Sequence, residues 1–191
     1  MKIAIFGGCF NPCHIMHKQI ALDLLEKNYC DKVIYVPASN KYDKKGLADD
    51  IHRLNMLKIM CKGNERLEVD DFELYGDLKY TYQTLDHFSE VYKGSELYFI
   101  LGYDNLFEFK TWKRYTYVLS NYKLLVIARN DINREFLESE FNEYLNNIIF
   151  TLVKPKKISS TNIREELKKH RHSDLIEKEV LDYVIKNKLY I

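Results

Sequence analysis

The stretch Gly7-Gly8-Cys9-Phe10-Asn11-Pro12-Cys13-His14-Ile15-Met16-His17 decides the fold of this 191-residue chain. The apolar run Lys2–Phe6 before it is typical of a buried parallel strand. The residues after it predict a helix with one apolar stripe, made of Met16, Ile20, Ala21, Leu24 and Leu25. In an open parallel sheet such a strand-to-helix junction is where ligands bind, and the N–H groups that begin the helix favour phosphate. We infer a nucleotide site at this junction.

Apolar runs alternate with helical periods along the rest of the chain, which predicts an α/β fold with a doubly wound parallel sheet. The expected strands are Lys2–Phe6, Lys32–Val36, Leu67–Asp70, Glu96–Leu101, Lys123–Ala128 and Ile148–Val153. The expected helices are Met16–Asn28, Asp50–Cys61, Thr81–Tyr92, Asp104–Phe109, Arg134–Asn146, Asn162–Lys169 and Asp174–Lys186. Since no repeat, low-complexity segment or linker interrupts the sequence, we expect a single domain over residues 1–191. The helices of the last forty residues are expected to pack against the sheet edge and to complete the site.

Composition excludes several classes of protein. The 29 Lys and Arg residues nearly balance the 28 Asp and Glu residues, so no global field attracts nucleic acid or a membrane surface. The basic stretches 154–157 and 168–172 have few interleaved aromatic residues, which makes a nucleic-acid role the least supported. The apolar runs are too short to span a bilayer, and no signal peptide is expected at the N-terminus. Four cysteines without paired spacing outside the first motif predict reduced thiols and a cytoplasmic protein.

The first motif can bind phosphate in a simple way. Gly7 and Gly8 permit a tight turn and a close approach of a ligand. His14 and His17 are three residues apart at a helix start, so they project from one face and can donate to phosphoryl oxygens. Neither G-x-G-x-x-G nor G-x-x-x-x-G-K-[ST] is present. Two alternatives stay open: solvated histidines at an ordinary corner, or a zinc set of Cys9, Cys13, His14 and His17 whose spacing fits no common zinc pattern.

The second motif is Ile158-Ser159-Ser160-Thr161-Asn162-Ile163-Arg164. Its serines, threonine and asparagine are candidate helix N-caps, and this ordinary role explains much of it. The surplus hydroxyls and an arginine one turn into the helix also suit an anionic ligand, which Arg164 would hold from a second helix N-terminus.

Together the two motifs resemble the HxGH-type nucleotidyltransferases, specifically the adenylyltransferases that act on nicotinate or nicotinamide mononucleotide. Residues 7–17 are similar to that family's G-G-S-F-D-P-x-H-x-G-H, and residues 158–164 match its I-S-S-T-x-I-R. Weaker similarities lie between and after them: Val36-Pro37, Tyr80-Thr81 with Thr84-Leu85, Leu101–Leu106 with Trp112, Arg129, and Leu189-Tyr190. The resemblance covers nearly the whole chain and implies a Rossmann-like nucleotidyltransferase fold.

The chain departs from the family pattern at several positions. Cys9 replaces a serine, Asn11 an aspartate and Met16 a glycine, and the P-P-H-K motif of bacterial nicotinate-type enzymes is missing. The stretch 37–47 with His52-Arg53 looks more like the eukaryotic nicotinamide branch, whereas His14 is nicotinate-like. The resemblance therefore leaves the choice between the two mononucleotides open.

The resemblance implies transfer of AMP from ATP to nicotinate mononucleotide, and also to nicotinamide mononucleotide, by in-line attack of the mononucleotide phosphate on the α-phosphorus of ATP. Pyrophosphate would leave, and the dinucleotide would enter NAD biosynthesis. The implied catalytic residues are His14, His17 and Arg164. The implied ATP contacts are Gly7, Gly8, Phe10, Gly102, Asp104, Ser159, Ser160 and Thr161. The implied mononucleotide contacts are Cys9, Asn11, Lys44, Tyr80, Thr81, Thr84, Trp112 and Arg129. Mg²⁺ would be held mainly by substrate phosphates, with no metal site made by the protein alone.

Each of these residues also has an ordinary structural reading. Trp112 suits a core position, Asp104 a helix cap, and Thr81 and Thr84 a helix cap and surface. Lys44 suits a solvated loop. Competing functions are another nucleotidyltransferase, such as a phosphopantetheine adenylyltransferase or a cytidylyltransferase, and a non-catalytic nucleotide- or metal-binding module. A homo-oligomer is compatible with the sequence.

Overall fold

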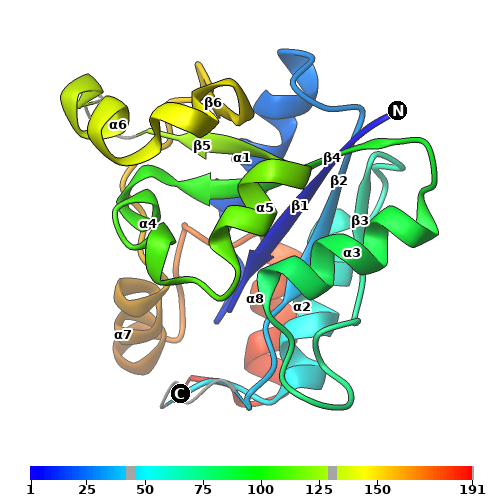
Figure 1. Cartoon of the computed structure of the whole chain (residues 1–191). Coiled ribbons are helices and arrows are strands. Elements are labelled where there is room, and N and C mark those ends of the chain that lie inside the picture. The colour runs from blue at the N-terminus through cyan, green and yellow to red at the C-terminus, as the bar shows by residue number, and fades with distance from the viewer. Residues whose placement is uncertain (42–45, 129–132, 191) are drawn as a thin grey trace.

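The computed structural model describes residues 1–41, 46–128 and 133–190 and contains a parallel sheet (Figure 1). Its strands are β1 (Lys2–Gly8), β2 (Lys32–Pro37), β3 (Leu67–Val69), β4 (Glu96–Gly102), β5 (Lys123–Ile127) and β6 (Ile148–Phe150). They run in the order β3-β2-β1-β4-β5-β6, and every adjacent pair is parallel. The predicted doubly wound parallel sheet is confirmed, and this order is that of Rossmann-like folds.

The helices mostly begin and end near their predicted positions. The structure has α1 (Ile15–Glu26), α2 (Asp50–Cys61), α3 (Thr81–Val91), α4 (Tyr103–Leu106), α5 (Tyr115–Asn121), α6 (Arg134–Phe141), α7 (Ser160–His170) and α8 (Lys178–Lys186). A 3₁₀ helix, Asn142–Asn147, replaces the end of the predicted helix Arg134–Asn146, and a second one, Phe109–Thr111, follows the shorter α4. The last helix begins at Lys178, four residues later than predicted. Helix α5 was missed, because its sequence YTYVLSN is rich in β-branched and aromatic residues that do not favour a helix.

Two apolar clusters cover the two faces of the sheet. One contains Ala4, Tyr35 and Ile100 and is covered by α1, α2, α7 and α8. The other contains Ile5, Phe99 and Val126 and is covered by α3, α5 and α6. Figure 1 shows α3 and α5 in front of the sheet, with α8 beside α2. The alternation of side chains along each strand produces these two faces.

The predicted stripe of α1 is buried as expected: Met16, Ile20, Ala21, Leu24 and Leu25 all belong to the first cluster. The C-terminal helices differ from the prediction, because they pack on a face of the sheet rather than against its edge. They contribute Ile163, Leu167, Val180 and Val184 to that same cluster, and Ile176 between them belongs to it too. Apolar side chains on one side of each helix account for this, since a face buries more apolar area than an edge.

The strand order reverses between β1 and β4, which pair directly in the middle of the sheet. Crevices at such a reversal, beyond the carboxyl ends of the strands, are where open α/β sheets bind ligands. Here those ends are Gly8 and Gly102, so the fold brings the first motif and the residues after β4 to one place. In the described ranges, no helix combines the length and apolar character needed to cross a membrane.

Candidate active site

The first motif forms the corner between β1 and α1, but its glycines do not make the turn. Gly7 and Gly8 continue β1, and the turn falls at Phe10, whose φ is 46°, and at the cis peptide bond between Asn11 and Pro12. The glycines are required for close packing instead. A Cβ atom on Gly7 would lie 3.2 Å from the ring of Phe99, and one on Gly8 would lie 3.1 Å from the ring of Phe10.

His14 and His17 stack at the start of α1, with ring centroids 3.7 Å apart and planes inclined by 14°. The backbone N–H of His14 donates to Nδ1 of His17 over 3.2 Å. The proton of a neutral His17 ring is therefore on Nε2, which makes Nε2 a donor. The three-residue spacing brings the two imidazoles together as predicted. His14 is buried and His17 is half-buried, so neither is a fully solvated surface histidine.

Phe10, an expected ATP contact, is instead a buried support for the histidines. It is 3% exposed and its ring meets that of His17 edge-on at 4.9 Å. Tyr35 of β2 packs against Phe10, and its hydroxyl donates to the His17 carbonyl over 2.9 Å. Burial raises the pKa of Tyr35, so this hydroxyl keeps its proton and stays a donor.

The second motif is partly an ordinary helix cap. Ser159 is the N-cap of α7, and its hydroxyl accepts the backbone N–H of Thr161 over 3.2 Å. The remaining polar groups of the motif reach other residues. The Ser160 hydroxyl donates to the Pro12 carbonyl over 3.0 Å, which ties α7 to the first motif.

Arg164 completes this connection between the two motifs. Its Nη1 donates to the Asn11 carbonyl over 2.8 Å, and its Nη2 donates to the Thr161 hydroxyl over 3.2 Å. The guanidinium and the imidazoles thus converge on one short loop, residues 11–14, although Arg164 is 153 positions from Asn11 in sequence. Arg164 is half-buried and Thr161 is exposed, so this side of the corner is accessible.

Asn11, an expected mononucleotide contact, has a structural role here. It is 4% exposed, and its Nδ2 donates to the Gly46 carbonyl over 2.9 Å. Its Oδ1 accepts the Ala48 N–H over 2.9 Å and the Tyr190 hydroxyl over 2.6 Å. The side chain therefore fastens a loop and the C-terminal segment to the first motif.

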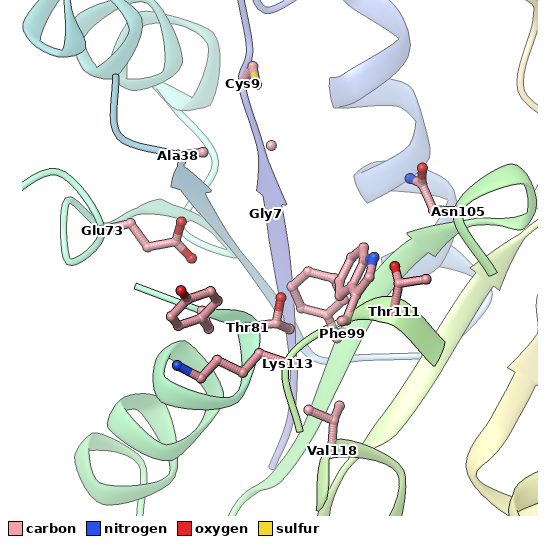
Figure 2. Close-up of a pocket in the computed structure, with 13 residues that line it drawn as sticks. Gly7, Cys9, Ala38, Glu73, Thr81, Phe99, Asn105, Thr111, Lys113 and Val118 are labelled. Carbon is pink, nitrogen blue, oxygen red and sulfur yellow. The ribbon is translucent and has the colours of Figure 1, made fainter. Parts of the chain in front are cut away.

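A cavity of about 430 Å³ opens beside Gly7 and Gly8 at the reversal of the sheet (Figure 2). The residues around it come from β1, β4, α3 and the segments that follow β2, β3 and β4. They are Gly7, Gly8, Cys9, Ala38, Glu73, Tyr80, Thr81, Phe99, Asn105, Thr111, Trp112, Lys113 and Val118. The cavity thus gathers the predicted mononucleotide contacts Cys9, Tyr80, Thr81 and Trp112. Asn105, Lys113 and Glu73 were not predicted.

Trp112 packs against core rings and also lines the cavity. Its ring packs on Phe109, with centroids 5.0 Å apart, and meets Phe99 edge-on at 6.0 Å. It is only partly buried, and it lines the cavity. Gly102 is the N-cap of α4, and Asp104 is exposed in the first turn of that helix. Lys44 and Arg129 lie outside the described residues.

Thr84, expected near the pyridine substituent, lies behind the cavity wall. It is fully buried, and its hydroxyl donates to Oε1 of Glu73 over 2.6 Å. Glu73 is 8% exposed and itself lines the cavity. Burial raises the pKa of Glu73 to about 7, and the hydrogen bond from Thr84 opposes that shift. Figure 2 shows its carboxyl group directed toward the space between Gly7 and Thr81.

Arg53 is a second residue whose role was missed. Its side chain is completely buried, and it donates to the carbonyls of Cys9, Ala38 and Ala48 at 2.8, 2.6 and 3.0 Å. It also contacts the side chains of Asn40 and Asp50. Arg53 therefore holds the ends of β1 and β2 against the loop that follows β2.

The zinc alternative gains no support from the described residues, which bring no three His, Cys, Asp or Glu side chains together as a metal site. Cys13 in particular is completely buried, and burial raises the pKa of its thiol well above the usual range. Cys9, Cys13, Cys30 and Cys61 are free thiols in the structure.

Known proteins share this arrangement. A family model described as cytidylyltransferase-like matches residues 5–166. A Clostridium acetobutylicum protein named "probable nicotinate-nucleotide adenylyltransferase" is 38% identical over 100% of this chain and 99% of its own. A Fusobacterium nucleatum protein of the same name is 38% identical over 94% of this chain and 95% of its own. The solved Plasmodium falciparum nicotinic acid mononucleotide adenylyltransferase, complexed with NaAD, shares the fold with a TM-score of 0.82 at 23% identity, covering 99% of this chain and 97% of its own. The chain therefore belongs to the cytidylyltransferase-like family and, within it, to the nicotinate-nucleotide adenylyltransferases.

Proposed function

We propose that this protein transfers the adenylyl group of ATP to nicotinate mononucleotide, with nicotinamide mononucleotide as a second acceptor, releasing pyrophosphate. The products would be deamido-NAD and NAD. The observation that carries this proposal is the junction of the two motifs at residues 11–14, next to a cavity of mononucleotide size. Membership of the family and the names of the full-length relatives support the same reaction.

The histidine pair would act on the triphosphate. Nε2 of His17 is oriented as a donor by the bond between Nδ1 and the His14 backbone, so it can stabilise the charge that builds up on the phosphate oxygens during transfer. Stacking on His14 fixes the plane of the His17 ring. The reaction needs positioning and charge neutralisation rather than a protein nucleophile, and this corner offers both.

Arg164 would hold the triphosphate from the opposite side. Its planar fork suits phosphate oxygens, and its present bonds to Asn11 and Thr161 keep it extended toward the first motif. Gly7, Gly8, Gly102, Asp104 and the hydroxyls of 159–161 are proposed to surround ATP, with Phe10 supporting the histidines from below. Residues 158–191 thus complete the ATP site within a single domain over residues 1–191.

The mononucleotide would place its phosphate at the histidine corner and its ring in the cavity. Trp112 would stack on the pyridine ring, a contact that contributes about 0.5–1.5 kcal/mol beyond area burial. Cys9, Tyr80 and Thr81 would line the remaining walls. Lys44 and Arg129 remain proposed contacts. Asn11 would act indirectly, by fastening the loop after β2 and the C-terminal segment, and Thr84 would act through its hydrogen bond to Glu73.

Mg²⁺ fits this site as an ion carried by the substrates. The described residues present no cluster of protein ligands, so phosphate oxygens and water would hold it. When bound, Mg²⁺ neutralises phosphate charge and orients the leaving pyrophosphate. ATP and the pyridine mononucleotide are then the proposed partners, without nucleic acid, in a cytoplasmic protein. A homo-oligomer stays a prediction.

The direct test is a panel of acceptors supplied with ATP and Mg²⁺, followed by pyrophosphate release and by chromatography of the products. Nicotinate mononucleotide should give deamido-NAD with the highest kcat/KM. Phosphopantetheine with ATP, and choline phosphate or glycerol 3-phosphate with CTP, test the competing nucleotidyltransferase functions. Turnover confined to one of those acceptors would overturn the proposal, as would stoichiometric zinc that survives dialysis together with no turnover of any acceptor.

A further inference from the structure

Glu73 places a carboxyl group where a pyridine nucleotide would place its own charged or polar substituent. Nicotinate carries a carboxylate on the ring and nicotinamide a carboxamide, and the two differ by one charge. Of the described residues that line the cavity, Glu73 is the one with a carboxyl group. A second carboxylate beside it is unfavourable when both are ionised, whereas a carboxamide is not.

The carboxyl group of Glu73 is fixed on the cavity wall. The two residues beside it anchor the segment between β3 and α3: the ring of Phe72 stacks on His87 at 3.9 Å, and Leu74 is buried. Thr84 donates to Oε1 over 2.6 Å from α3, so one oxygen is occupied from behind. The group can therefore neither swing into solvent nor turn away from the cavity without breaking a buried hydrogen bond.

The opposite wall orients the ring. Phe99 and Trp112 line the cavity, and Figure 2 shows Phe99 on the other side of β1 from Glu73, with Thr81 between them. With the phosphate of the mononucleotide at the histidine corner and the ring against Trp112, the edge of the ring faces Glu73 and Thr81. This placement rests on the proposed function.

We propose that Glu73 is a specificity-determining residue, whose protonated carboxyl group donates to the carboxylate of nicotinate mononucleotide and whose ionised form accepts from the carboxamide of nicotinamide mononucleotide. The preferred acceptor then depends on pH. Burial raises the pKa of Glu73 to about 7, which brings the change into the working range of the enzyme. The other ionisable groups that line the cavity are Cys9, Tyr80 and Lys113. The segment that carries Glu73 also holds Asp70, Asp71, Tyr75, Asp77 and Lys79, and α3 holds Tyr82, Asp86, His87 and Glu90.

The test is the ratio of kcat/KM for nicotinate mononucleotide to that for nicotinamide mononucleotide, measured from pH 6 to 8.5. Titrations of ATP, the histidines and the phosphate common to both acceptors cancel in this ratio. If nicotinate binding requires the protonated group, while the carboxamide of nicotinamide can accept from the protonated group and donate to the ionised one, a pKa of about 7 makes the ratio fall about 30-fold across this range. The E73Q variant should show a ratio that changes less than about twofold, because its amide can donate and accept at every pH.

Two further variants distinguish a direct effect of Glu73 on acceptor choice from a general disturbance of the segment between β3 and α3. T84V removes the hydrogen bond that lowers the raised pKa of Glu73, so that pKa should rise further. The pH at which the kcat/KM ratio has fallen by half should then be higher than in the parent protein. D77N makes the same acid-to-amide change in the same segment at an exposed position, and its profile should match that of the parent protein.

The outcomes separate the two proposals. If neither acceptor releases pyrophosphate, the proposed function fails. If both are used but the parent ratio is flat with pH, or the E73Q ratio still falls as steeply as the parent ratio, the role of Glu73 is refuted and the proposed function stands.

Discussion

Replacing Arg53 by methionine should destabilise the protein strongly, although Arg53 lies outside both motifs. The side chain is completely buried and is the donor for three backbone carbonyls. Methionine has similar length but no donor, so Cys9, Ala38 and Ala48 each lose a partner. A buried acceptor left without its partner costs about 1–3 kcal/mol. Allowing for some relaxation and water entry at the partly exposed Ala48, we expect a loss of about 3–5 kcal/mol in the free energy of unfolding.

The assay is urea unfolding followed by circular dichroism, together with a thermal scan. For a chain of this size, 1 kcal/mol shifts Tm by about 2–4 °C, so R53M should melt about 6–20 °C below the parent protein. K58M is the matched control, since Lys58 is an exposed residue of the same helix, and it should change stability by less than about 0.5 kcal/mol. An R53M loss below about 1 kcal/mol would refute the reasoning, because the buried hydrogen bonds would then contribute almost nothing.

Three shorter predictions address the proposed site. H17N keeps an acceptor for the His14 N–H but loses the imidazole, so kcat should fall about 100- to 1,000-fold with little change in Tm; near-parental turnover would exclude His17 from the mechanism. W112A should raise KM for the pyridine mononucleotide more than KM for ATP, and equal effects on both would indicate a purely structural tryptophan. Iodoacetamide should label Cys9 alone, because burial raises the pKa of Cys30 and Cys61 to about 12 and that of Cys13 even higher. Nicotinate mononucleotide should slow this labelling as read by mass spectrometry, and an unchanged rate would argue against Cys9 at the acceptor site.

The features predicted well are those that local patterns determine. Apolar runs predict all six strands, and the spacing of His14 and His17 predicts their meeting at the start of α1. The second motif and the family resemblance implied that Arg164 holds the same ligand as the histidines, and the bond to Asn11 does bring Arg164 to the first motif.

The features that were missed depend on tertiary contacts. Arg53 follows His52 in a helix whose pattern does not show that a cation is buried there, and its partners are carbonyls that no side-chain pattern marks. Glu73 lies in a polar segment between two elements, where an acid is ordinarily solvated. Its carboxyl group accepts a hydrogen bond from Thr84, for which the family resemblance implied direct contact with the substrate. Helix α5 forms against the sheet through Val118 and Leu119, and packing overrides its weak helix propensity.

The bonds from Asn11 to Tyr190 and Arg164 have a consequence for biosynthesis. The first strand and the histidine corner leave the ribosome early, but two of the groups that hold this corner are among the last residues translated. A nascent chain could thus assemble β1, β2 and α1 while still lacking the arginine and the tyrosine that fasten the loop. Catalytic competence should appear late, and a chain that stops short of residue 160 should be inert, because it also lacks the core residues Ile163, Leu167 and Val184.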